Sequence, residues 1–144
     1  MFSKSCEYAI KASIFIAQKR EGVQCVRVKE IAKGINAPEH FVAKILQELS
    51  RKKVISSMKG PNGGFCMSEA QINKPVLDIV LLIDGDGILN NCVLGLEHCS
   101  SSNPCPMHLE YQKIKLGIKN MLEKNTIRDF NNLLVAKEAV LFTD

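Results

Sequence analysis

The sequence predicts a mainly α-helical protein with a small β-hairpin wing: a winged helix-turn-helix followed by a long dimerisation helix. Three observations lead to this prediction. Two helical segments joined by a short turn precede a glycine-rich hairpin within residues 29–67. A heptad-like run of apolar residues occurs farther along the chain. The first part of the chain is also strongly basic, as proteins that bind polyanions often are.

The DNA-binding region is expected to span residues 1–74. Residues 3–20 are rich in helix formers and are expected to form a largely buried helix. A short β-prone piece over residues 25–28 precedes a helical stretch over 29–33. In the turn over residues 34–37, Asn36 tolerates left-handed backbone angles, and Pro38 suits the first turn of the next helix.

That next helix, over residues 38–52, is the predicted recognition helix. Its apolar residues follow the spacing of one buried face: Phe41, Val42, Ile45, Leu46 and Leu49. Two short strands are expected over residues 54–57 and 65–67, and the glycine-rich loop between them must turn tightly. The first turns of a helix reach base edges in the major groove. The candidate DNA-binding residues are Glu39, His40, Ala43, Lys44 and Gln47 on the helix, and Ser57, Lys59, Gly60, Asn62 and Gly63 on the wing.

Residues 75–144 are expected to pack with the first region as one compact unit. A helix is predicted over 75–83, an ordered loop over 90–106 (the cysteine loop), a long helix over 106–124 and a final helix over 126–135. Apolar residues spaced 4, 3, 4, 3 along the long helix form a seam, which is the candidate dimer interface. The alternative is that this seam packs against the chain's own core. The seam residues are Met107, Tyr111, Ile114, Ile118 and Met121.

Charge and composition narrow the classes of protein. Residues 1–74 carry 13 Lys and Arg against 6 Asp and Glu, a net +7, whereas residues 75–144 carry a net −3, for +4 in all. The chain is 46% hydrophobic and 24% charged, as globular proteins are. It has no apolar run of about 20 residues and no signal peptide pattern, so we expect a cytoplasmic protein with no membrane partner.

Three cysteines form the candidate metal site. Cys92, Cys99 and Cys105 lie within 14 residues, and His108 follows Cys105 after two residues. Thiolates and imidazole suit an iron–sulfur cluster or zinc, and the lack of a C-x₂-C pair favours the cluster. The other cysteines, Cys6, Cys25 and Cys66, lie singly and are expected to be small apolar core residues. No catalytic triad, carboxylate pair or phosphate-binding loop is evident, so an enzyme is not expected.

Several short motifs resemble those of the bacterial winged-helix regulators that include the iron–sulfur regulator IscR and the nitric-oxide sensor NsrR. The motifs are YA at residues 8–9, KEIA at 29–32, KIL at 44–46, SMKGPNGGF at 57–65, DIV at 78–80 and the three-cysteine loop. The resemblance implies a homodimer whose recognition helix reads the major groove and whose wing touches the minor groove. It also implies a [2Fe–2S] or [4Fe–4S] cluster on the three cysteines, with His108 of this chain or Glu7 of the other subunit as fourth ligand.

The expected function is therefore that of a homodimeric transcription regulator that binds a duplex DNA operator and acts as a repressor or an activator. The cluster is expected to control its DNA affinity by sensing redox state, iron or nitric oxide. Two alternatives stay open. One is a member of the same family with no cluster or with zinc, responding to a small molecule or a partner. The other is a small metal or electron-transfer protein. The family's wing arginine and a common glutamate are Lys59 and Ala43 here, which implies a different operator.

Overall fold

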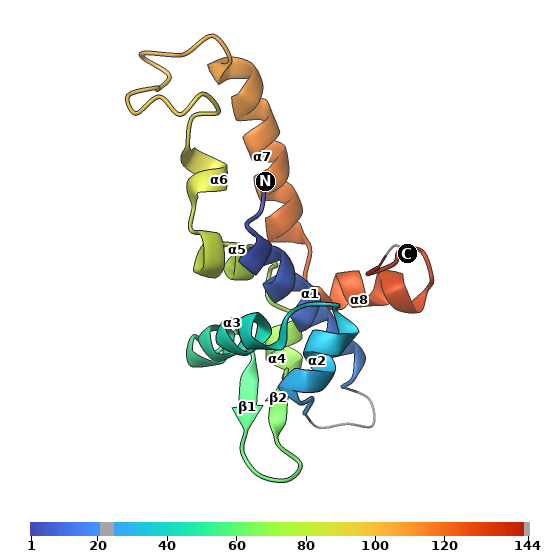
Figure 1. Ribbon diagram of the computed structural model, residues 1–144. Helices are drawn as coiled ribbons and strands as arrows, with labels where there is room; N and C mark the ends of the chain where they lie inside the picture. The colour runs from blue at the N-terminus through green and yellow to red at the C-terminus, as the bar shows by residue number, and fades with distance from the viewer. Residues whose placement is uncertain (21–24, 143–144) are drawn as a thin grey trace.

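The computed structural model describes residues 1–20 and 25–142, and it confirms the predicted fold class. Helices dominate this part of the chain, and a two-stranded antiparallel hairpin projects from them (Figure 1). The elements are α1 (Lys4–Gln18), α2 (Val28–Gly34), α3 (Glu39–Arg51), β1 (Ser56–Met58), β2 (Gly64–Cys66), α4 (Glu69–Ile72), α5 (Leu77–Asp84), α6 (Gly87–Asn90), α7 (His108–Lys124) and α8 (Ile127–Val135). None of the helices described is long and apolar enough to cross a membrane.

Helix α1 lies at the centre of the core. Ser3 begins the helix because its hydroxyl oxygen accepts a hydrogen bond from the Cys6 N–H at 3.0 Å. Cys6, Ala9 and Ala12 are fully buried, and α3, α5 and α8 pack around α1. Small side chains on this helix let its neighbours approach closely. The expectation that Cys6 is a core residue is confirmed.

The turn between α2 and α3 sets the direction of the predicted recognition helix. Asn36 adopts the left-handed conformation with φ 51°, as expected. Val42, Leu46 and Leu49 bury the inner face of α3. The prediction that Phe41 shares this buried face is wrong, since its side chain is 50% exposed. Successive helical residues are about 100° apart, so Phe41 lies beyond the edge of the face that Val42 centres.

The wing is shifted slightly from its predicted position. Strands β1 and β2 pair Ser56 with Cys66 and Met58 with Gly64, so β1 begins two residues later than expected and β2 one residue earlier. Gly64 has φ +141°, and a Cβ there would lie 2.3 Å from the Val26 carbonyl oxygen. Only glycine therefore allows this close approach of the two backbones.

The prediction that Cys25 and Cys66 are isolated core residues is wrong, because the two form a disulfide with their Cα atoms 4.5 Å apart. Between them lies a β-bridge in which Val26 and Phe65 exchange backbone hydrogen bonds of 2.8 and 2.7 Å. This bridge places the two cysteines opposite each other. The β-prone piece over residues 25–28 is thus a bridge to the wing, and α2 already begins at Val28.

Residues 75–142 extend away from the helical core through α6 and the cysteine loop, and the chain returns to the core along α7. Figure 1 shows α7 leading from the helical body to the cysteine loop at its far end, with α6 beside it. Two short helices, α4 and α6, were not expected from the sequence. Helix α8 returns to pack against α1, and its first turn is held by a capping box between Thr126 and Asp129.

Candidate functional site

The outer face of α3 is polar and open to solvent. Glu39, His40, Lys44 and Gln47 are exposed, and Ala43 is half-buried between them. A shallow groove of about 280 Å³ runs along the second half of this face. Its lining residues are Lys44, Gln47, Glu48 and Arg51. The predicted helix residues therefore share one accessible surface.

The wing presents a second part of the predicted DNA surface. Ser57, Lys59, Gly60 and Asn62 are exposed. Gly63 is buried, and its N–H donates to the Gly60 carbonyl at 2.9 Å, so this amide serves the turn itself. A Cβ at Gly63 would lie 2.3 Å from the Met58 carbonyl oxygen. Gly63 thus shapes the wing tip that carries Lys59 and Asn62.

Two exposed side chains near this surface were not among the predicted site residues. The Arg27 guanidinium donates a hydrogen bond to the Pro61 carbonyl, which places a further cation at the wing tip. On the first turn of α3, the rings of His40 and Phe41 lie 4.5 Å apart. No sequence motif identifies Arg27 as a site residue. The exposure of Phe41, in contrast, could have been predicted from its angular position at the edge of the apolar face of the helix.

The three predicted cysteines meet at the far end of α7. The Sγ atoms of Cys92, Cys99 and Cys105 all lie within 4.8 Å of one another. Backbone turns bend the loop around them, with Gly95 N–H donating to the Cys92 carbonyl at 3.0 Å and Ser100 and Asn103 bonding each other. The Cys92 and Cys105 Sγ atoms are 3.7 Å apart. Two thiolates bound at about 2.3 Å to one tetrahedral ion lie about 3.8 Å apart, so this donor set fits a metal.

The thiols at this site influence one another. The Leu96 N–H, above all, lowers the pKa of the Cys92 thiol to about 7. At Cys99 the Cys105 N–H lowers the thiol pKa, but burial and the Cys105 and Cys92 thiols together raise it above its ordinary value. Three adjacent thiolates repel one another, and a bound cation would stabilise all three.

The two candidate fourth ligands lie in different surroundings. His108 Nδ1 is 3.2 Å from the Cys99 Sγ, and its Nε2 is buried without a hydrogen-bond partner among the residues described. Glu7 is outside this group and pairs with Lys4, Nζ to Oε2, at 3.1 Å. Within one chain, His108 is therefore the candidate beside the thiols.

The predicted seam on α7 is mostly uncovered. Met107, Ile114 and Met121 are 47%, 55% and 46% exposed, whereas Tyr111 and Ile118 are half-buried. Packing within the chain covers Ile118 in part. Beside the seam, a groove of about 660 Å³ runs between the start of α1, α6 and α7. An apolar helix face of this kind is usually covered by a partner.

Comparison with known proteins gives a consistent result. The family model Rrf2, described as an iron-dependent transcriptional regulator, matches residues 2–132. A putative HTH-type transcriptional regulator of Aquifex aeolicus is 33% identical over 135 residues, covering 92% of each chain. The HTH-type transcriptional regulator NsrR of Oceanobacillus iheyensis is 24% identical, covering 88% of this chain and 86% of the relative.

Solved structures share the fold. CymR, the global cysteine regulator of B. subtilis, superposes with a TM-score of 0.76 at 23% identity, covering 92% of this chain and 96% of that one. IscR of T. potens gives a TM-score of 0.72 at 22% identity, covering 100% and 93%. The predicted resemblance is confirmed, and the relatives are transcriptional regulators and not enzymes.

Proposed function

We propose that this chain, which belongs to the Rrf2 family of transcriptional regulators, binds duplex DNA as a homodimer and that an iron–sulfur cluster on Cys92, Cys99 and Cys105 sets its DNA affinity. The observation that carries the proposal is the meeting of three thiols at the end of α7, far along the chain from the exposed face of α3. The exposed face of α3 would bind DNA, and the three thiols would separately bind a metal through soft sulfur ligands.

The proposed DNA contacts lie on α3 and the wing. Lys44 and Gln47 would reach base edges in the major groove, while Lys59 and Asn62 would follow the adjacent phosphates. The net +7 of residues 1–74 supports this assignment because phosphate contacts dominate affinity. Gly63 would contribute through the shape of the wing tip.

The proposed metal ligands are three thiolates and one further group. A bound iron–sulfur cluster would supply a centre that responds to oxidants, iron supply or nitric oxide. His108 supports a fourth ligand from the same chain, since its Nδ1 already faces Cys99. Glu7 would have to come from a second copy of the chain.

Zinc is the alternative that one observation favours. The 3.7 Å between the Cys92 and Cys105 Sγ atoms fits two thiolates on a single tetrahedral ion, and zinc often binds three cysteines and one histidine. A zinc-bound member of the family would respond to a different signal, and metal content separates the two cases.

The route from metal site to DNA would run through α7. Cys105 is three residues before His108, the first residue of that helix, and the His108 N–H donates to the Cys105 carbonyl at 3.0 Å. A change in how the three cysteines are held would therefore move the first turn of α7 and the seam on it. Half-sites lie about 34–36 Å apart, so a small rotation between protomers would cost contacts in one groove. A coupling of about 1–3 kcal/mol changes affinity about 5- to 150-fold.

The test is anaerobic purification of the full chain, followed by measurement of iron, sulfide and zinc and of DNA affinity. We expect iron and sulfide in the wild type and their loss in Cys99→Ser, with a changed affinity. Cys6→Ala is the matched control, because it removes a buried cysteine of α1 outside the site. Zinc in place of iron overturns the cluster assignment. Loss of the cluster with unchanged DNA affinity overturns the switch.

A further inference from the structure

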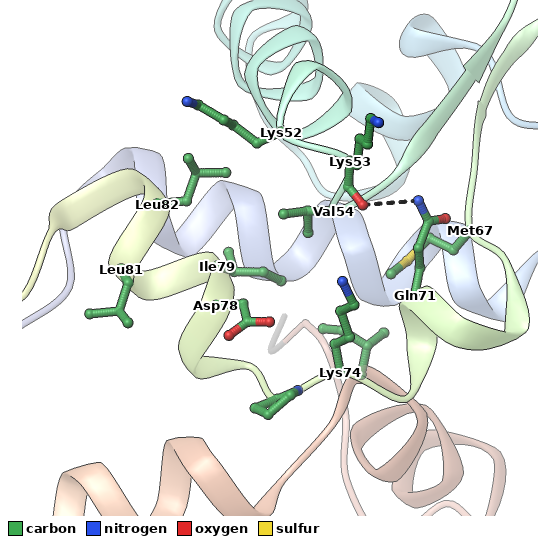
Figure 2. Close-up of a pocket in the computed structure, with 12 residues that line it drawn as sticks. Lys52, Lys53, Val54, Met67, Gln71, Lys74, Asp78, Ile79, Leu81 and Leu82 are labelled. Atoms are coloured by element: carbon green, nitrogen blue, oxygen red, sulfur yellow. Dashed lines mark hydrogen bonds between the residues drawn. The ribbon is translucent and has the colours of Figure 1, made fainter.

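A pocket of about 430 Å³ opens between the DNA-binding region and the helices that follow it (Figure 2). Its walls come from the turn after α3, from Met67 just after β2, from α4 and the turn that follows it, from α5 and from the start of α8. It shares no lining residue with the exposed face of α3 or the cysteine loop. Its volume falls within the range of small-molecule sites, about 300–1,000 Å³.

The floor of the pocket is apolar. Met67 and Ile79 are buried, and Val54 and Leu82 are half-buried beside them. Figure 2 shows Val54, Ile79 and Leu82 turned toward a common space. A hydrocarbon or aromatic portion of a ligand would bury against these side chains, at about 25 cal/mol for each Å² removed from water.

The rim of the pocket is cationic. Lys52, Lys53 and Lys74 line it together with a single acid, Asp78. None of these four side chains forms an ion pair within the described ranges 1–20 and 25–142. Figure 2 shows the Lys74 ammonium and the Asp78 carboxylate over the apolar floor, whereas Lys52 and Lys53, in the turn after α3, direct their ammonium groups away from it. The Lys74 ammonium is the cation closest to the floor, and three lysines against one carboxylate give the lining a net positive charge that favours an anionic guest.

The wall that carries Lys52 and Lys53 is held in place by hydrogen bonds. Lys53 adopts φ +60°, which is uncommon for a residue with a side chain. Its carbonyl accepts a hydrogen bond from Gln71 Nε2 at 3.1 Å, and the Gln71 Oε1 accepts from the Ser68 N–H at 2.8 Å. A preorganised wall loses less entropy when a ligand binds.

We propose that this pocket binds a small amphipathic anion: one carboxylate or phosphate group paired with Lys74, attached to an apolar moiety that lies on the Val54–Ile79–Leu82 floor. Lys74 is the central partner of the anionic group. Asp78 limits the affinity for a ligand that carries only negative charge, because it is a like charge on the same rim.

The experiment uses the full chain without DNA, so its outcome is independent of the proposed function. Methyl groups of Met67 and Ile79 are labelled with ¹³C and followed by NMR during titration with hexanoate, hexyl phosphate or the neutral hexanamide. We expect saturable shifts of these methyl signals with at least one anion and much weaker binding of hexanamide. The anion that binds more tightly identifies the head group.

Charge variants test the rim. Lys74→Met, which keeps most of the side-chain stem, should weaken anion binding about three- to fivefold, and Lys52→Met should weaken it less. Asp78→Asn should tighten it. Lys113→Met, on the exposed side of α7, is the control and should change nothing. Equal shifts with hexanamide, no saturable shift with either anion up to about 50 mM, or full affinity in Lys74→Met with a well-dispersed spectrum would each overturn the proposal.

Discussion

The Asp84 carboxylate accepts two hydrogen bonds from Ser3, one from the backbone N–H at 2.8 Å and one from the hydroxyl. Ser3 is the N-cap of α1, and Asp84 is the last residue of α5. The contact joins residues 81 positions apart and ties the central helix of residues 1–74 to α5, the first helix of residues 75–144. We propose on this basis that the two regions unfold as one cooperative unit.

Removal of this contact should destabilise the whole chain. Asp84→Ala leaves the Ser3 N–H and hydroxyl without their acceptor, and we expect a loss of about 1–2 kcal/mol in the free energy of unfolding. Urea denaturation followed by circular dichroism measures it as a single transition. Glu97→Ala, in the exposed part of the cysteine loop, is the control and should be neutral. Two separate transitions would show that the regions unfold independently.

The sequence predicts the elements that carry a strong local pattern of residues. It misses the features that depend on contacts between distant parts of the chain. The spacing from Val42 to Leu49 is long enough to identify α3, and the glycines after Met58 identify the wing. Helices α4 and α6 have four residues each, too few for a periodic signal. The Cys25–Cys66 pair joins residues 41 positions apart, and no local pattern encodes such a contact.

The candidate site follows the same division. The density of cysteines after Asn90 predicts that three thiols meet, and they do. The contact of His108 Nδ1 with Cys99 requires the loop to close on itself, so the sequence leaves the choice between His108 and Glu7 open. Arg27 joins the wing through a hydrogen bond to Pro61 that no spacing reveals.

Acid should weaken the contact between α4 and its two arginine partners. Glu69 accepts from Arg20 at 3.0 Å and also pairs with Arg128, and the Arg20 hydrogen bond, above all, lowers the pKa of this carboxyl. A lowered folded-state pKa stabilises the fold above the unfolded pKa of about 4.3, and this contribution is lost as pH falls through the folded-state value. The stability difference between wild type and Glu69→Gln should therefore be present at pH 7 and shrink below pH 4.

Urea denaturation at several pH values measures this difference. Glu110→Gln, which removes the exposed partner of Lys113 on α7, is the matched control and should give a smaller difference at pH 7. A wild-type and Glu69→Gln difference that stays constant with pH would contradict the assigned role of the two arginines.

Reduction of the Cys25–Cys66 disulfide should lower stability and loosen the wing. A disulfide closing a loop of this length typically contributes roughly 2–4 kcal/mol. Thermal unfolding with and without dithiothreitol measures the loss. The double variant Cys25→Ser with Cys66→Ser should unfold at the reduced wild-type temperature and ignore the reductant. If dithiothreitol lowered the unfolding temperature of that variant as much as that of the wild type, the effect would belong to the cysteine loop.

Lysines of the two proposed DNA-contacting elements, α3 and the wing, should differ in what they control. Lys44→Ala removes a candidate base contact and should cost about 1–3 kcal/mol of DNA affinity. Lys59→Ala removes a candidate phosphate contact and should reduce the slope of log affinity against log salt by about 0.9. Fluorescence anisotropy with a duplex operator at several salt concentrations separates the two effects. Lys113→Ala on α7 should behave as wild type, and loss of affinity there would contradict the assigned surface.

The seam on α7 should hold two copies of the chain together, and Ile114 tests it more cleanly than Ile118. Ile118 packs partly against the core, so a charge there would also disturb the fold, whereas Ile114 is 55% exposed. Burial of each seam side chain would contribute roughly 1.5–3 kcal/mol to dimer formation, and each residue contributes twice because a two-fold axis relates the two copies. Ile114→Asp should give folded monomers in analytical ultracentrifugation and lose DNA affinity. Leu116 is 56% exposed but about 200° farther around the helix, so Leu116→Asp should remain dimeric. A dimeric Ile114→Asp with unchanged DNA affinity would place the interface elsewhere.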